Sequence, residues 1–301
     1  LPLIKSDGYA TYNFCHITDD YDMGITHIFR TDEFISSTPK FLSIYEALEI
    51  TPPKFVTLAP IMAEGGKKKL GKRDGAKDVL EYLHEGVLVE GLINFLALLG
   101  WNPGEGNNQE IFSLDELIKT FSLKGLGKSG ANFDEKRLEW INGHHIRNLP
   151  IDKLYELSKD YLPKEVQNHP VYYQKSVLAI IQERLKFLNE IPELTSFFFA
   201  EPKVSKDQLL EVKGIEGNED ATELLKATTE LLKSSDFSVD DLQAKLNQLL
   251  IDLETKPGIL FALIRNSVSG SKVTPGLFEM LNVLGKDITL IRLNSALDTL
   301  K

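Results

Sequence analysis

The feature that most constrains the fold is a repeated helical pattern that runs from residue 78 to the end. Apolar side chains recur at helical spacing, so each segment has one face to bury. The segment 113–121 opens with a Ser113–Glu116 capping box, and two later segments have proline near the start and glycine just past the end. We predict helices over residues 88–101, 113–121, 170–189, 219–233, 238–253, 257–269 and 274–284.

The first 60 residues show a different pattern, in which strand and helix features are mixed. An apolar stripe behind Pro39 predicts a helix over 36–48. This helix and the three strands predicted for this region follow the order β, β, α, β, which indicates part of an α/β sheet. The chain also begins with Leu1 within this strand-rich material, as expected of a processed product or an excised fragment. β-branched and aromatic runs predict three strands, at 10–17, 24–30 and 54–62.

Composition excludes several classes of protein. Apolar residues make up 42% and charged residues 26% of the 301 residues, as in a soluble globular protein. No run of about 18 apolar residues occurs, so we expect no membrane span. Cys15 is the single cysteine, which excludes an internal disulfide and a multi-cysteine zinc site. No His-x-x-x-His pair is present, so we expect no metal. From the single cysteine we expect a reducing cytoplasmic location.

Residues 67–77 form a basic cluster, with six basic residues and one acidic residue. The whole chain, in contrast, has a net charge of −10, which argues against nonspecific coating of nucleic acid. Ammonium groups in a loop flanked by glycines could neutralise charge that grows on a polyphosphate. The alternative is a solvated charge run or a bare contact with RNA phosphates. No Gly-x-x-x-x-Gly-Lys-Ser/Thr motif precedes the cluster, which argues against a P-loop.

Arg30 is the second candidate site residue, because it ends an apolar strand. Ligands of open α/β sheets bind at the carboxyl ends of strands, and a guanidinium can hold a carboxylate in bidentate fashion. The alternative is a structural ion pair with Asp32 or Glu33. Tyr12 could offer its hydroxyl to the same ligand, or simply be a half-buried strand tyrosine.

Several long blocks resemble one family, the bacterial-type glutamyl-tRNA synthetases of class I. Residues 7–48 resemble the end of its catalytic domain, and KKKLGKRDGA resembles its version of the class I lysine loop, usually written Lys-Leu-Ser-Lys-Arg. Blocks that begin within 88–142, such as NFLALLGW and FDEKRLEWINGHHI, resemble its stem-contact region, and residues 264–297 resemble its helical anticodon-binding region. The blocks occur in the family's order along nearly the whole chain.

The resemblance implies a mixed, mostly α fold in three parts. Residues 1–60 would be the remnant of a Rossmann-like catalytic domain, 61–155 the lysine loop and stem-contact region, and 156–301 an all-α anticodon-binding domain. It implies glutamate, ATP with Mg²⁺, and tRNA-Glu as substrates and partners, with tRNA-Gln as a further candidate. Zinc is not expected.

The resemblance also implies roles for single residues. Lys72 would stabilise the leaving pyrophosphate, within a loop formed by Lys69, Leu70, Gly71, Lys72 and Arg73. Tyr12 and Arg30 would hold glutamate, and Glu33 would lie near ATP and the acceptor end. Arg265 and Leu277 would approach anticodon bases. Gln182 falls near a position where some members that discriminate strictly between tRNAs carry arginine against the third anticodon base. A glutamine there would imply a more relaxed choice of tRNA.

Two departures from the family pattern keep an alternative open. Gly71 stands where the family usually has serine, and no His-x-Gly-His motif occurs, so the N-terminal half of the catalytic domain would be a missing partner. One hypothesis is therefore the C-terminal part of a glutamate–tRNA ligase, inactive alone. The other is a non-catalytic tRNA-binding module derived from a synthetase.

Overall fold

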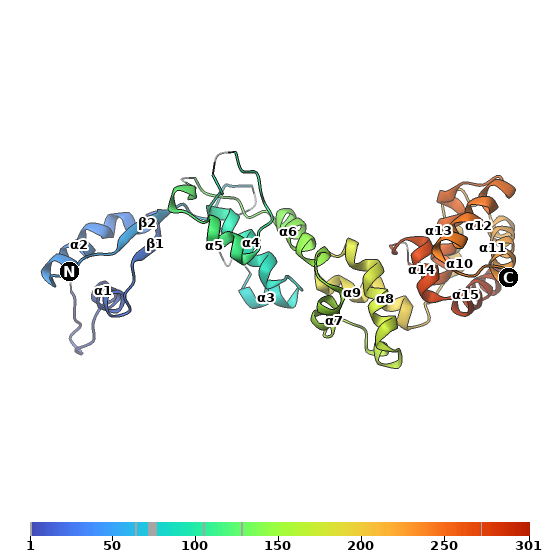
Figure 1. The fold of residues 1–301 in the computed structure, drawn as a ribbon, viewed down its shortest axis with the longest axis horizontal. Coiled ribbons are helices and arrows are strands. Elements are labelled where there is room, and N and C mark those ends of the chain that lie inside the picture. The colour runs from blue at the N-terminus through green and yellow to red at the C-terminus, as the bar shows by residue number, and fades with distance from the viewer. Residues whose placement is uncertain (1, 64, 72–76, 105, 128, 272) are drawn as a thin grey trace. The chain divides into compact units, whose positions relative to one another are not determined.

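A computed structural model describes residues 2–63, 65–71, 77–104, 106–127, 129–271 and 273–301. Its contacts divide the chain into two compact units. The first contains residues 1–82 and 89–141, and the second contains 83–88 and 142–301. Among the described residues, no helix has the length and apolar character needed to cross a bilayer. The predicted mixed, mostly α fold is confirmed (Figure 1).

The first unit contains a βαβ arrangement that follows helix α1 and consists of β1 (His27–Thr31), α2 (Thr38–Ala47) and β2 (Lys54–Leu58). Strands β1 and β2 pair in parallel, with Arg30 opposite Thr57, and the connection between them carries α2, as parallel strands require a crossover. The elements that begin in this unit are α1 Tyr12–Asp22, β1 His27–Thr31, η1 Asp32–Ser37, α2 Thr38–Ala47, β2 Lys54–Leu58, α3 Val79–His84, α4 Val89–Gly100, α5 Leu114–Thr120, η3 Leu123–Gly125 and α6 Glu135–Arg147.

The strand predicted at 10–17 is wrong, because these residues enter helix α1. Phe14, Ile17 and Thr18 lie on one helical face, and Ile17 is fully buried. Ile17 packs with Phe41 and Tyr45 of α2 in a small core. The β-branched and aromatic composition predicted a strand, but burial of an i, i+3, i+4 face against α2 decides for a helix.

The other predictions for this unit hold in outline. Strands form near 24–30 and 54–62, although both are shorter than predicted. Helix α5 has the predicted capping box, since the Ser113 hydroxyl accepts from the Glu116 amide while the Glu116 carboxylate accepts from the Ser113 amide. The sequence thus located these elements from local patterns alone.

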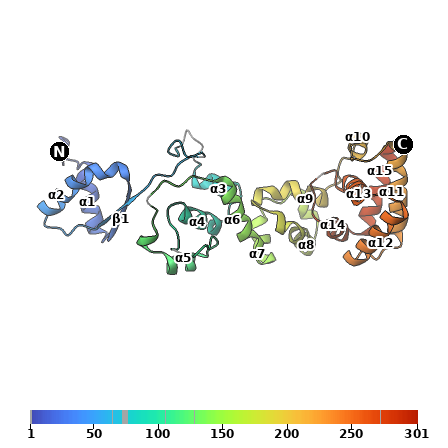
Figure 2. The same cartoon turned by 90° about the horizontal axis from the view of Figure 1, so that it is seen from above.

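The second unit is helical. Its elements are α7 Ile151–Ser158, η4 Lys164–Asn168, α8 Val171–Ile181, η5 Gln182–Arg184, η6 Leu188–Glu190, α9 Ile191–Phe199, α10 Lys206–Leu210, α11 Asn218–Lys233, α12 Val239–Asp252, α13 Pro257–Ser269, α14 Leu277–Leu284 and α15 Lys286–Leu300. Helix α15 packs along α11 (Figure 2). Buried side chains of α11 to α15 form most of one large core.

Two details of this unit bear on the predictions. Gly270 ends α13 in the left-handed conformation, with φ of 63°, as the proline-to-glycine pattern predicted. The helix predicted over 170–189 is wrong in extent, because α8 stops at Ile181. A short 3-10 turn follows, and the Glu190 carboxylate then accepts from the backbone amides of Lys186 and Phe187, which turns the chain before α9.

Candidate functional site

Arg30 lies in a box of aromatic rings. Its Cζ atom is 4.7 Å from the ring centre of Phe34, 5.3 Å from that of Phe41 and 5.6 Å from that of Tyr12. Such contacts stabilise a guanidinium without using its hydrogen-bond donors. Its Nη1 is buried and has no hydrogen-bond partner among the described residues. The structure thus brings together Tyr12 and Arg30, both of which the sequence analysis singled out.

The ion pair predicted as the alternative role of Arg30 does not form in the described part of the chain. Asp32 pairs instead with Lys69, whose Nζ lies 3.4 Å from Asp32 Oδ1. Both side chains are about half exposed, so this pair contributes little to stability. The ion pair instead holds the start of the lysine loop near the residues that follow β1.

Backbone hydrogen bonds fix the base of the lysine loop. The Leu70 amide donates to the Ile61 carbonyl at 2.8 Å, and the Ala63 amide donates to the Lys68 carbonyl at 2.8 Å. Gly66 makes the turn at φ of 69°, where a Cβ atom would come within 2.9 Å of the Asn132 side chain. Lys72 and Arg73 lie outside the described residues.

A cavity of about 470 Å³ opens beside this base. Thr31 and Leu58, the last residues of β1 and β2, line it together with Glu33, Lys69 and Leu70. It therefore lies at the carboxyl ends of two parallel strands, where open α/β sheets bind ligands, and its size suits a small molecule. Three predicted residues, Glu33, Lys69 and Leu70, meet here.

Sequence reasoning missed two polar side chains beside Arg30. His16 stacks on Tyr12 with ring centres 4.9 Å apart, and Tyr45 is almost fully buried in α2. Burial and then the negative charge of Asp20 raise the pKa of Tyr45, while the Arg30 cation acts in the opposite direction. The i, i+4 spacing of Tyr12 and His16 would have indicated their proximity, had the segment been predicted as a helix.

The second unit holds the three predicted anticodon residues in different settings. Arg265 is half-buried on α13, and its pKa is lowered by burial and by the neighbouring cation of Arg184. Leu277 is buried at the start of α14. Gln182 donates its amide to the carbonyl oxygens of Ile146 at 2.9 Å and of Leu149 at 2.8 Å. Leu277 is thus engaged in packing and Gln182 in hydrogen bonds to the backbone. Arg265 is the predicted residue that is influenced by another cation.

Arg184, which the sequence analysis did not single out, is exposed on η5. In the described part of the chain, neither Arg184 nor Arg265 has a carboxylate partner within ion-pair distance. Guanidiniums without an acidic partner are chemically suited to an anion such as phosphate. No sequence pattern indicated this pair, because the two residues are 81 positions apart.

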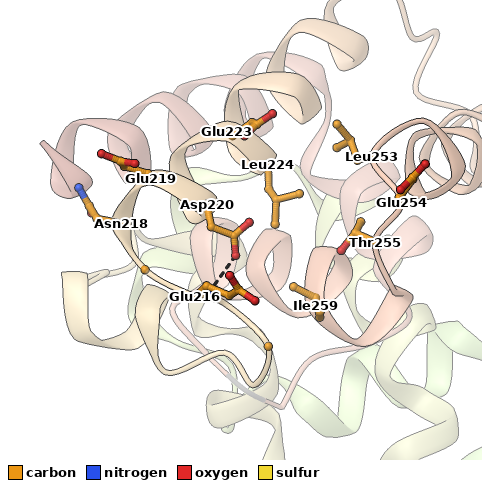
Figure 3. A pocket seen from close by; sticks show the side chains of 12 residues that line it. Glu216, Asn218, Glu219, Asp220, Glu223, Leu224, Leu253, Glu254, Thr255 and Ile259 are labelled. Atoms are coloured by element: carbon orange, nitrogen blue, oxygen red, sulfur yellow. Dashed lines mark hydrogen bonds between the residues drawn. The ribbon is translucent and has the colours of Figure 1, made fainter.

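A cavity in the second unit has a charge opposite to that of this arginine pair. It measures about 690 Å³, and carboxylates line it (Figure 3). These belong to Glu216, Glu219, Asp220, Glu223 and Glu254. Acidic walls repel phosphate, so this cavity is no candidate for binding nucleic acid. The described residues also contain no group of three or more potential ligands arranged for a metal ion.

Comparison with protein-family models divides the chain in the same order. Residues 2–140 match the catalytic domain of class I tRNA synthetases (E and Q). Residues 153–297 match an anticodon binding domain.

Individual proteins give the same result. The chain is 37% identical over 301 residues to the glutamate–tRNA ligase of Clostridium tetani, covering 99% of this chain and 61% of that protein. It is 39% identical over 290 residues to glutamate–tRNA ligase 2 of Caldicellulosiruptor saccharolyticus, covering 94% of this chain and 58% of that protein.

A solved structure is similar along the same extent. The crystal structure of a glutamate tRNA ligase from Elizabethkingia meningosepticum, in complex with its amino acid, matches with a TM-score of 0.83 and 29% identity. The match covers 99% of this chain and 62% of that one. The chain thus spans about three fifths of the length of these relatives.

Proposed function

Because the chain belongs to the class I tRNA synthetases of the glutamate and glutamine type, we propose that it is the carboxy-terminal part of a glutamate–tRNA ligase. That enzyme activates glutamate with ATP and transfers it to tRNA-Glu. The observation that carries the proposal is the cavity at the strand ends, which gathers Glu33, Lys69 and Leu70.

In this proposal Arg30 holds a carboxylate of glutamate, with Tyr12 beside it. A planar guanidinium already stacked on rings loses little freedom when it forms two parallel hydrogen bonds. The buried ring of Phe41 on one side of the guanidinium excludes water there, which strengthens the interaction with a carboxylate. Specificity for an acidic amino acid follows from this positive charge.

The lysine loop supplies charge in the transition state. Negative charge grows on the leaving pyrophosphate as the glutamate carboxylate attacks the α-phosphate of ATP. Lys72, assisted by Lys69 and Arg73, stabilises this charge, and Mg²⁺ bound to the phosphates would share the task. The hydrogen bond from the Leu70 amide to the Ile61 carbonyl, which fixes the start of the loop, supports this role.

The test is glutamate-dependent exchange of pyrophosphate into ATP. We expect no exchange by the chain alone, and exchange when the amino-terminal part of a close relative is added. Lys72→Met should then lower the exchange rate by about a hundredfold or more, as loss of one transition-state contact does. Lys226→Met, at an exposed position of α11, is the control. Glutamate-dependent exchange by the chain alone would contradict the division of the active site proposed here.

Transfer also needs tRNA, and we propose that Arg184 and Arg265 bind its phosphate backbone or anticodon loop. tRNA-Glu is the proposed partner, and tRNA-Gln is tested beside it. The proposed location is the cytoplasm, where translation takes place. Binding of the two tRNAs to this chain, measured at one salt concentration, would compare them.

A second function is favoured by one residue, Gly71. The glycine removes a hydroxyl from the lysine loop, as would be acceptable in a tRNA-binding module without catalysis. Gly71→Ser separates the two functions. In an enzyme the substitution should change the exchange rate, whereas in a binding module neither form would show exchange with the complementing segment present.

A further inference from the structure

The short helix η1, Asp32–Ser37, makes three different contacts through consecutive residues. Asp32 pairs with Lys69 at the start of the lysine loop. Glu33 lines the cavity at the strand ends. Phe34 presents the face of its ring to the guanidinium of Arg30. Two of these residues are acidic, so the aromatic residue needs an explanation of its own.

Phe34 is the nearest of the three rings to Arg30. The Cζ atom lies 4.7 Å from its ring centre, compared with 5.3 Å for Phe41 and 5.6 Å for Tyr12. The rings also differ in exposure, since Phe41 is 1% exposed and Tyr12 is 55% exposed. Phe34 is partly buried and packs against the small core that contains Phe41. It therefore combines the closest contact with support from the core, although it is not one of the fully buried core residues.

The backbone of Phe34 is held from both sides. On one side the chain passes from β1 into η1 without a linker, because Thr31 ends the strand and Asp32 begins the helix. On the other side the Thr38 hydroxyl donates to the Phe34 carbonyl oxygen at 3.0 Å, and Thr38 is the first residue of α2. Strand, turn and helix thus fix the place of this ring relative to Arg30, which lies four residues earlier on β1.

Arg30 itself is not held by an ion pair in the described part of the chain. No carboxylate there lies within ion-pair distance of its guanidinium. A long arginine side chain has many rotamers, so ordering it when a ligand binds costs conformational entropy. An aromatic face can order a guanidinium in advance, because it attracts the charge and leaves the N–H donors unused. The nearest ring thus supplies the order that an ion pair would otherwise give.

We propose that Phe34 is a positioning residue for Arg30. Its ring holds the guanidinium in one place near the end of β1, so that the N–H donors meet the substrate carboxylate without first being ordered. The proposal rests on the proposed function, in which Arg30 binds glutamate, and it adds a residue that does not touch the substrate. Because the contact is the same in the ground state and the transition state, its loss affects KM rather than kcat.

The first experiment is NMR of the arginine side chains in this chain, which needs no substrate. An aromatic ring displaces the resonances of atoms that lie over its face, so we expect those of Arg30 to differ from those of the exposed Arg184. Phe34→Leu should reduce this displacement, whereas Phe34→Tyr should preserve it. Phe121→Leu, at an exposed ring of the same unit, is the control. Arg30 resonances that are unchanged in Phe34→Leu would overturn the proposal.

The second experiment measures kinetic constants in the complemented exchange assay. Phe34→Leu should raise the KM for glutamate by about tenfold, the effect of losing a partly desolvated cation–π contact, and should leave kcat and the KM for ATP unchanged. Phe34→Tyr, which restores a ring, should recover most of this loss. Changes of similar size in kcat and in the KM for ATP would indicate a general structural role for Phe34 and reject the positioning role.

A combined variant separates the failure of this inference from that of the proposed function. If Phe34 acts through Arg30, Phe34→Leu should raise the KM for glutamate no further in a chain that already carries Arg30→Gln. Additive effects of the two substitutions, or a KM raised by Arg30→Gln but not by Phe34→Leu, would reject the positioning role. If Arg30→Gln by itself leaves KM unchanged, the proposed function of Arg30 fails instead.

Discussion

Arg292 donates from Nη2 to the carbonyl oxygen of Phe197 at 2.7 Å, although the two residues are 95 positions apart. Its Nη1 donates to the carbonyl oxygen of Val268 at 2.7 Å, and Nη2 also reaches that of Ala200 at 3.1 Å. One buried guanidinium therefore caps the ends of α9 and α13 from α15. Burial lowers the pKa of Arg292, and Tyr173 and Glu201 oppose this shift.

The first prediction follows from that contact. Arg292→Leu would leave three carbonyl oxygens without this donor, which should cost about 3 kcal/mol of local stability. Hydrogen exchange at the amides of α13 and α15 should then become roughly a hundredfold faster. Arg184→Leu, at an exposed position, should change exchange little. Equal exchange in Arg292→Leu and the parent chain would show that the caps are unimportant.

The second prediction concerns the geometry of the aromatic box. Arg30→Lys keeps the charge but loses the planar fork and its stacking on Phe34, so glutamate affinity should fall by at least about tenfold. The KM for glutamate in the exchange assay measures the effect. Arg137→Lys, at an ion pair with Glu110 elsewhere in the same unit, is the matched control. An unaltered KM in Arg30→Lys would show that charge alone is sufficient.

The third prediction tests the two cations of the second unit. If Arg184 and Arg265 contact tRNA phosphates, each glutamine substitution should lower the slope of log affinity against log salt by about one. Filter binding at several salt concentrations gives this slope. Lys226→Gln, near the acidic surface of α11, should leave it unchanged. Equal slopes for all three variants would place the tRNA elsewhere.

The fourth prediction concerns alkaline pH. Burial raises the pKa of Tyr173 to about 12, with Arg292 acting in the opposite direction. An unfolded tyrosine ionises near pH 10, so the contribution of Tyr173 to stability is complete below that pH and is lost as the pH rises toward about 12. The free energy of unfolding of Tyr173→Phe should therefore fall less steeply with rising pH in this range than that of the parent chain. Tyrosinate absorbance of the two proteins checks the late-titrating group directly, and a Tyr173 that titrates with the exposed tyrosines would refute it.

Local patterns in the sequence determined most of the helices and the family. Periodicity, the Ser113 capping box and the stop at Gly270 depend on neighbouring residues, so one sequence is enough to recognise them. The lysine cluster and Arg30 were recognisable for the same reason, since their residue types suit phosphate and carboxylate. Resemblance then gave these residues roles.

Only the tertiary structure decided the conformation of residues 10–17 and the surroundings of the site residues. Helix α1 forms where composition indicated a strand, because its face packs on Phe41 and Tyr45 of α2. The packing of His16 and of Arg30 against Phe41, and the electrostatic influence of Arg184 on Arg265, involve residues that are not neighbours in the sequence. Such encounters depend on how whole elements pack, and no spacing along the sequence encodes them.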